Sequence, residues 1–153
     1  QVFDWAQEVS PSQPLTVGIW EYNSQWQPAE NSLNELILNR SDIISFHCYE
    51  PREKLIAVIE SLKTFGRPLL CTEWLARTAG STVDLLEVFD EHGVGAINWG
   101  LVDGRTQTRF PWRSWTEPVT DEEPWFHELL HRDGTPYDND EVDVFRRLTS
   151  QHS

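Results

Sequence analysis

Four short apolar segments alternate with segments of helical spacing along this chain, and this order constrains the fold more than any other feature. Parallel strands need long connections, usually helices, so the alternation predicts an α/β fold built from parallel βα units. The predicted strands are residues 15–20, 42–49, 69–74 and 94–101. The predicted helices are residues 2–9, 31–40, 51–64, 81–92 and 140–149, with a shorter one at 123–131.

Helix-start signals support two of these helices. Ser32 followed by Glu35 matches a capping box, and Ser81 is expected to cap the helix that follows it. The chain of 153 residues suits one domain, residues 1–153, but is short for a complete (β/α)8 barrel of roughly 200 residues or more. An open flavodoxin-like sheet is the alternative topology, although no glycine-rich phosphate loop accompanies it.

The net charge of −13 argues against nucleic acid or anionic membrane as a partner, because phosphate groups are bound by clustered Lys and Arg. No segment is long and apolar enough to cross a membrane. The two cysteines are not expected to form a disulfide or a zinc site. His92, His127 and His131 are interpreted as surface or capping residues, so no metal or other cofactor is expected.

Each predicted strand ends in residues suited to a binding site, and ligands of parallel α/β folds bind at the carboxyl ends of strands. Glu73 is the most informative, because a charge following a buried strand is costly unless it faces a solvated mouth. Eight tryptophans add flat surfaces suited to sugar rings. Trp20 ends the first predicted strand, while Trp112 and Trp115 lie in a long loop, where they face a ligand or cover the last helix.

Three segments resemble the C-terminal half of the clan A glycoside hydrolases, the retaining (β/α)8 enzymes of the cellulase, mannanase and β-galactosidase type. They are LLCTEW (69–74), AINWGLV (96–102) and DGTPY (133–137). The resemblance covers nearly the whole chain and implies a (βα)4 half of a TIM barrel with parallel strands, equivalent to strands five to eight. It implies Glu73 as the catalytic nucleophile, Tyr49 and His47 beside it, and Trp99 as the floor under the cleaved sugar; Trp20 and Trp112 are further candidate substrate-binding residues.

One part of the family pattern is missing. Retaining hydrolysis needs a second carboxyl group about 5–5.5 Å from the nucleophile, acting as acid and then base. In the resembled family it is a Glu after an Asn at the end of strand four, and no such pair ends a predicted strand here. Glu21 and Glu50 lie near strand ends without matching it. The expectation is therefore weak or no hydrolysis by this chain alone, with a non-catalytic carbohydrate-binding or self-assembling module as the alternative.

A half barrel also has two unpaired strand edges and an exposed apolar inner face, which favour association. We expect either that two copies close an eight-stranded barrel as a homodimer, or that the chain binds a missing N-terminal half. A carbohydrate, as oligo- or polysaccharide, is the expected ligand.

Overall fold

Three short parallel strands form the sheet of this protein. The computed structural model describes residues 1–19 and 21–151. Strands β1 (Ile44–His47), β2 (Leu69–Glu73) and β3 (Gly95–Ala96) are parallel neighbours in the order β1-β2-β3. Helix α3 (Arg52–Lys63) connects β1 to β2, and α4 (Leu85–Glu91) lies between β2 and β3. The predicted α/β class with parallel strands is confirmed, and the consecutive strand order is compatible with half of a barrel.

The first predicted strand, residues 15–20, is wrong as a regular strand. Within its described part only Ile19 forms a parallel bridge, to Phe46, with backbone hydrogen bonds on both sides of that contact. Earlier in the segment one backbone bond remains, from the Asp42 amide to the Leu15 carbonyl, and side chains accept the others: the Leu15 amide donates to Asp42 Oδ2 and the Val17 amide to Ser41 Oγ. Such side-chain bonds compete with regular strand pairing. The segment still lies beside β1, so four chain segments run across the sheet.

The fourth predicted strand, residues 94–101, is also shorter than expected. Beyond β3 the chain continues along β2 and its end through two backbone hydrogen bonds: the Ile97 amide donates to the Cys71 carbonyl, and the Trp99 amide donates to the Trp74 carbonyl. At Gly100 the backbone turns to a φ of 82°, which is accessible to glycine and ends the extended run.

The remaining helices are α1 (Val2–Glu8), α2 (Ser32–Arg40) and α5 (Asn139–Gln151), with 3-10 turns η1 (Arg77–Ala79) and η2 (Trp112–Trp115). Asn31, and not Ser32, caps α2: its side chain accepts a hydrogen bond from the Asn34 amide at 2.8 Å. Ser81 does not cap α4, which begins at Leu85, because its hydroxyl is buried and accepts a bond from the Leu75 amide.

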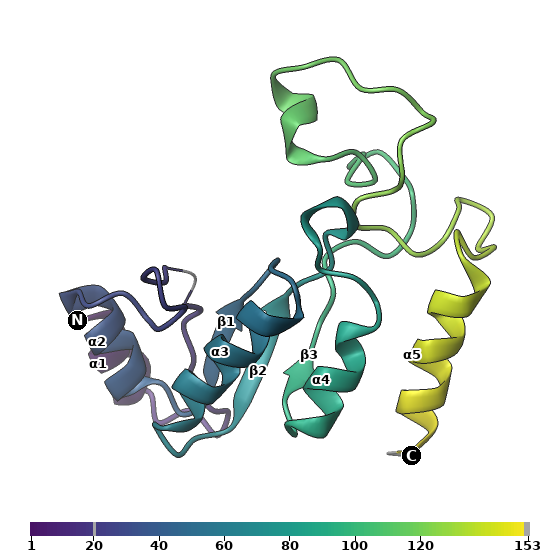
Figure 1. The fold of residues 1–153 in the computed structure, drawn as a ribbon. Helices are drawn as coiled ribbons and strands as arrows, with labels where there is room; N and C mark the ends of the chain where they lie inside the picture. The colour runs from purple at the N-terminus through teal and green to yellow at the C-terminus, as the bar shows by residue number, and fades with distance from the viewer. Residues whose placement is uncertain (20, 152–153) are drawn as a thin grey trace.

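The predicted helix at residues 123–131 is absent. This segment instead donates and accepts backbone bonds with distant parts of the chain: Phe126 bonds to Arg109 and Arg77, and Leu129 to Leu101. Tertiary hydrogen bonding therefore overrides the local helical pattern. Figure 1 shows α3, α4 and α5 side by side in chain order, and the long segment between β3 and α5 rising beyond the carboxyl ends of the strands.

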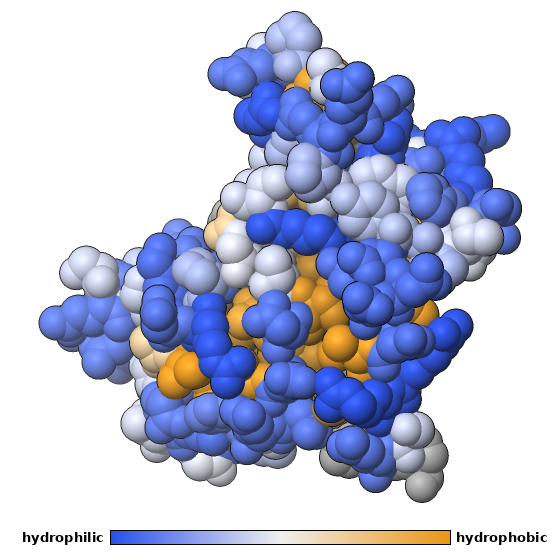
Figure 2. Space-filling view, turned by 45° about the vertical axis from the view of Figure 1, so that its right-hand side comes forward, coloured by the Kyte–Doolittle hydropathy of each residue, from blue (hydrophilic) through white to orange (hydrophobic). Residues whose placement is uncertain are grey.

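The core lies between the sheet and helices α3 and α4. Its largest fully buried side chains include Phe46, Trp74 and Phe89, and the Trp74 ring packs edge-on against Phe89 at 5.3 Å between centroids. Figure 2 shows an apolar area surrounded by hydrophilic residues on the face turned to the viewer. No helix within residues 1–19 and 21–151 is long and apolar enough to cross a membrane.

Candidate functional site

The carboxyl ends of β1 and β2 bring three predicted site residues together. Tyr49 Oη donates a hydrogen bond of 2.7 Å to Glu73 Oε2, and His47 Nδ1 lies 3.3 Å from the same oxygen. A β-bulge between Phe46 and His47 produces this arrangement, because it shifts the register so that His47 pairs with Glu73. The Glu73 side chain is 26% exposed, so its carboxylate is open to a cavity and supported from two neighbouring positions.

Tyr49 is suited to act as a permanent hydrogen-bond donor. Burial raises the pKa of Tyr49, and the hydrogen bond to the Glu73 carboxylate raises it further. The phenol therefore stays protonated at physiological pH and orients the carboxylate. Its ring packs edge-on against Trp112, with 5.1 Å between centroids. Trp112 thus belongs to the same site although it lies 63 residues further along the chain than Tyr49.

The three residues face a cavity of about 990 Å³. Aromatic side chains from separate segments contribute much of its wall: Tyr22, Trp26, Trp99, Phe110, Trp112 and Trp115. The predicted substrate residues Trp99 and Trp112 are among them, whereas Trp20 lies outside the described residues. Trp115 also reaches the cavity, so both tryptophans of the long loop face a possible ligand site and neither merely covers the last helix.

His127 corrects a sequence-based prediction. It is buried and lines the cavity, whereas the sequence suggested a surface or capping histidine. Its Nδ1 is 2.5 Å from the Leu75 carbonyl oxygen, so the Nδ1 hydrogen points away from the cavity. Burial lowers the pKa of His127, which favours the neutral imidazole. The ring lies 5.6 Å from that of Tyr49 and 5.8 Å from that of Trp112.

The backbone just after β2 is held in an uncommon conformation. Leu75 has a φ of 76°, in the left-handed region that leucine rarely adopts, and its side chain is fully buried. Two side chains hold it: Ser81 Oγ accepts from its amide, and His127 Nδ1 donates to its carbonyl oxygen. These contacts fix the direction in which the chain leaves Glu73.

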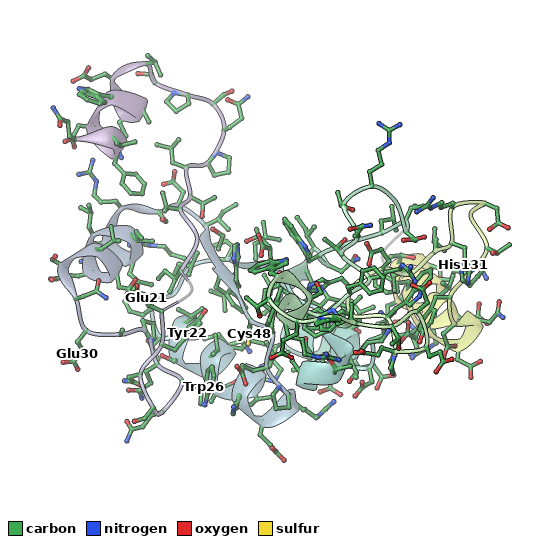
Figure 3. The ribbon with its side chains drawn as sticks, turned by 90° about the horizontal axis from the view of Figure 1, so that it is seen from above. Glu21, Tyr22, Trp26, Glu30, Cys48 and His131 are labelled. Carbon is green, nitrogen blue, oxygen red and sulfur yellow. The ribbon has the colours of Figure 1, made fainter. Side chains whose placement is uncertain are left out.

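The other carboxylates considered from the sequence occupy different places. Glu50 lines the cavity, and its Oε2 lies 2.7 Å from Lys54 Nζ. Glu21 bonds to Asn31 Nδ2 at 3.2 Å. Figure 3 shows Glu21 and Tyr22 on the same side of the molecule as Trp26 and Cys48, far from His131.

Glu128 is a carboxyl group that the sequence did not single out. It is completely buried, accepts a hydrogen bond from Thr108 through Oε1, and has no partner for Oε2 in the described structure. Burial raises the pKa of Glu128. Glu128 does not line the cavity, but Thr108 does, so the hydrogen bond between them holds a residue of the cavity wall in place.

Both cysteines are free and buried. Burial raises the pKa of Cys48 to about 11 and also raises that of Cys71, so both remain thiols at neutral pH. Within the described part of the chain, no group of three or more His, Cys, Asp or Glu side chains is arranged to hold a metal ion.

Comparison with known proteins assigns no family to this chain. No protein-family model matches it, and no curated protein matches it.

Proposed function

We propose that this chain is a carbohydrate-binding half of a retaining glycoside hydrolase site, carrying the nucleophile but not its acid partner. The observation that carries the proposal is the Glu73 carboxylate, hydrogen-bonded by Tyr49 in an aromatic-walled cavity at the carboxyl ends of parallel strands. Glycosidases need such a carboxylate to form a glycosyl ester and to stabilise the oxocarbenium-like transition state.

The neighbours of Glu73 fit the role of a nucleophile. Tyr49 donates to Oε2 and leaves the other oxygen, Oε1, available to approach an anomeric carbon. His47 lies next to the same Oε2. The partly exposed Trp99 face provides an apolar surface for a sugar ring.

In this proposal the chain lacks the second carboxyl group of a retaining mechanism. Glu50 lines the cavity, but its Oε2 is bound by Lys54 Nζ at 2.7 Å, so this carboxylate is already engaged by a cation. Glu128 is behind the wall and does not line the cavity. We therefore expect weak or no hydrolysis of unactivated glycosides by the chain alone.

A partner is proposed to complete the barrel. Apolar side chains remain exposed along the chain that follows β3, with Ile97 54% and Leu101 58% exposed. Ile97 directly follows the edge strand β3, and exposed apolar side chains of this kind favour association with another chain. A second copy would bring its own Asn98 and Trp99 to the acid position and supply no carboxyl group, whereas a separate N-terminal half would supply one.

A non-catalytic carbohydrate-binding or self-assembling module is the second candidate. The ion pair of Glu50 favours it, because a cavity with aromatic walls and no free second carboxyl group binds a sugar without cleaving it. The two candidates differ in whether Glu73 reacts.

The test uses 2-deoxy-2-fluoroglycosyl fluorides of glucose, mannose, galactose and xylose, because fluoride leaves without protonation. The C1–F bond breaks while a Glu73 carboxylate oxygen forms a bond to C1, so intact-mass spectrometry should show one added glycosyl residue. Peptide mapping should place it on Glu73. Glu73→Gln, which has nearly the same shape and no charge, is the matched control and should stay unlabelled.

Sugar binding is measured in parallel by ligand-observed NMR with unactivated oligosaccharides. Binding without labelling would support the non-catalytic module. Absence of both binding and labelling would contradict the proposed function, and labelling that survives Glu73→Gln would contradict the role of Glu73.

A further inference from the structure

We propose that the cavity binds an extended, uncharged oligosaccharide and that Trp26 forms a second sugar platform, at the end of the cavity opposite Trp99. This inference rests on the proposed function, since it assumes that the cavity takes a carbohydrate. Beyond that function, the ligand is specified as longer than one sugar and uncharged, and a binding residue is placed away from Glu73.

The cavity extends across the ends of four neighbouring chain segments. Trp26 follows the segment bridged to β1 through Ile19, Tyr49 follows β1, Glu73 ends β2, and Trp99 follows β3. Adjacent strands lie about 4.8 Å apart, so these four positions span roughly 14 Å. The volume of about 990 Å³ is at the upper end of the usual range for ligand pockets. Both dimensions leave room for more than one sugar ring.

Trp26 is held in place by its own turn and by the end of β1. Its φ of 60° belongs to a turn in which Asn23 Oδ1 accepts hydrogen bonds from the Gln25 and Gln27 amides. Its ring packs 6.1 Å from that of Tyr22, whose hydroxyl donates to the His47 carbonyl at 3.2 Å. The platform is therefore connected to the same strand end that presents His47 to Glu73.

A charged pair supports the ring of Trp26 as well. Lys54 Nζ lies 4.5 Å from the ring centroid, and the Glu50 carboxylate binds that ammonium group at 2.7 Å. Of the two, Glu50 lines the cavity and Lys54 does not. A ligand at this end would meet an indole surface beside a carboxylate, which accepts hydrogen bonds from sugar hydroxyl groups.

The charges of the cavity select against an anionic ligand. Its described lining includes two carboxylates, Glu50 and Glu73, and no Lys or Arg. Two histidines also line it: burial lowers the pKa of His127, which favours its neutral form, and His47 Nδ1 already faces Glu73 Oε2 at 3.3 Å. A uronate, sulfate or phosphate group would lose water without meeting a Lys or Arg. Neutral sugars carry no such penalty.

Isothermal titration calorimetry with β-1,4-linked gluco-, manno- and xylo-oligosaccharides of one to four units tests the proposal. Oligogalacturonates of the same lengths form the anionic series. The variants are Trp26→Ala, Trp26→Tyr as the conservative aromatic replacement, and Trp5→Ala as the matched control. Trp5 is an exposed tryptophan on α1 and is not part of the cavity lining.

The wild type should bind a neutral series more tightly as length increases and should ignore the anionic one. Trp26→Ala should bind the tetrasaccharide about five- to tenfold more weakly, with binding of the shortest detectable ligand unchanged. Trp26→Tyr should bind the tetrasaccharide almost as tightly as the wild type, and Trp5→Ala should bind it with the same affinity as the wild type.

Different failures have different meanings. If the wild type binds no sugar of any length, the proposed function fails. If it binds tetrasaccharides and Trp26→Ala binds them equally well, the second platform is wrong while the proposed function stands. Equal loss for short and long ligands in Trp26→Ala and Trp26→Tyr would mean that the turn only holds the cavity together, which also overturns the platform. Equal binding of oligogalacturonates would overturn the charge selection.

Discussion

Replacing Arg77 should destabilise this protein more than replacing any exposed arginine. Its guanidinium, 9% exposed, donates to both carboxylate oxygens of Glu141 on α5 and to the carbonyl oxygens of Trp125 and Glu128. It also lies 5.0 Å from the ring centroid of Tyr137. One side chain thus joins the loop after β2 to the final helix and to the segment that carries His127.

The expected loss in the free energy of unfolding follows from these contacts. Removing one partner of a buried ion pair costs about 3–5 kcal/mol, because the other charge and the carbonyl groups lose their donor. Glu141 is 19% exposed, so water reaches it partly and the lower end, about 3 kcal/mol, is expected for Arg77→Met. With a urea m-value of about 1.5 kcal/mol/M, the unfolding midpoint should fall by about 2 M.

Urea unfolding followed by tryptophan fluorescence measures this change. Arg146→Met is the matched control, because Arg146 is 71% exposed and its ion pair among the described residues is with Asp143 on its own helix. Arg146→Met should lower the free energy of unfolding by less than about 0.5 kcal/mol. The reasoning is refuted if Arg77→Met and Arg146→Met unfold at the same urea concentration.

Three further predictions concern other parts of the molecule. Burial raises the pKa of Glu128, so the folded state holds the carboxyl proton more tightly than the unfolded state, and the stability of the protein falls as pH rises above the ordinary value of 4.5. Glu128→Gln should reduce the loss of stability between pH 5 and pH 8, measured by urea unfolding at both pH values, and an unchanged loss would contradict this prediction. Asn31→Ala removes the cap of α2 and should cost about 1 kcal/mol in thermal unfolding, whereas equal stability would exclude the cap. Leu101→Glu should halve the mass of a wild-type dimer in light scattering, and a monomeric wild type would count against closure by two copies.

The order of strands and helices was predictable because parallel βα units leave a strong pattern of apolar runs and helical spacing. The contact of Tyr49 and His47 with Glu73 was anticipated from the resemblance, and the structure brings all three together. The means by which it does so, a bulge after Phe46, has no clear sequence signal.

The errors have a common physical origin in hydrogen bonds that local sequence patterns do not contain. The segment around Leu15 loses its strand pairing to side chains of Ser41 and Asp42, which local propensity does not contain. Ser81 had the right residue type for a cap but bonds to Leu75 instead. His127 was predicted to lie at the surface, but it is buried in a segment, residues 123–131, where the expected helix does not form.

The left-handed Leu75 makes the end of β2 difficult to transplant. Glycine would relieve about 1–3 kcal/mol of backbone strain there, but it would also remove a buried side chain worth about 2–5 kcal/mol. The leucine is therefore the more stable choice only where a hydrophobic pocket and two hydrogen-bonding side chains already surround it. An engineer who moves Glu73 onto another α/β protein must move Ser81 and His127 with it, because these two residues set the angle at which that strand ends.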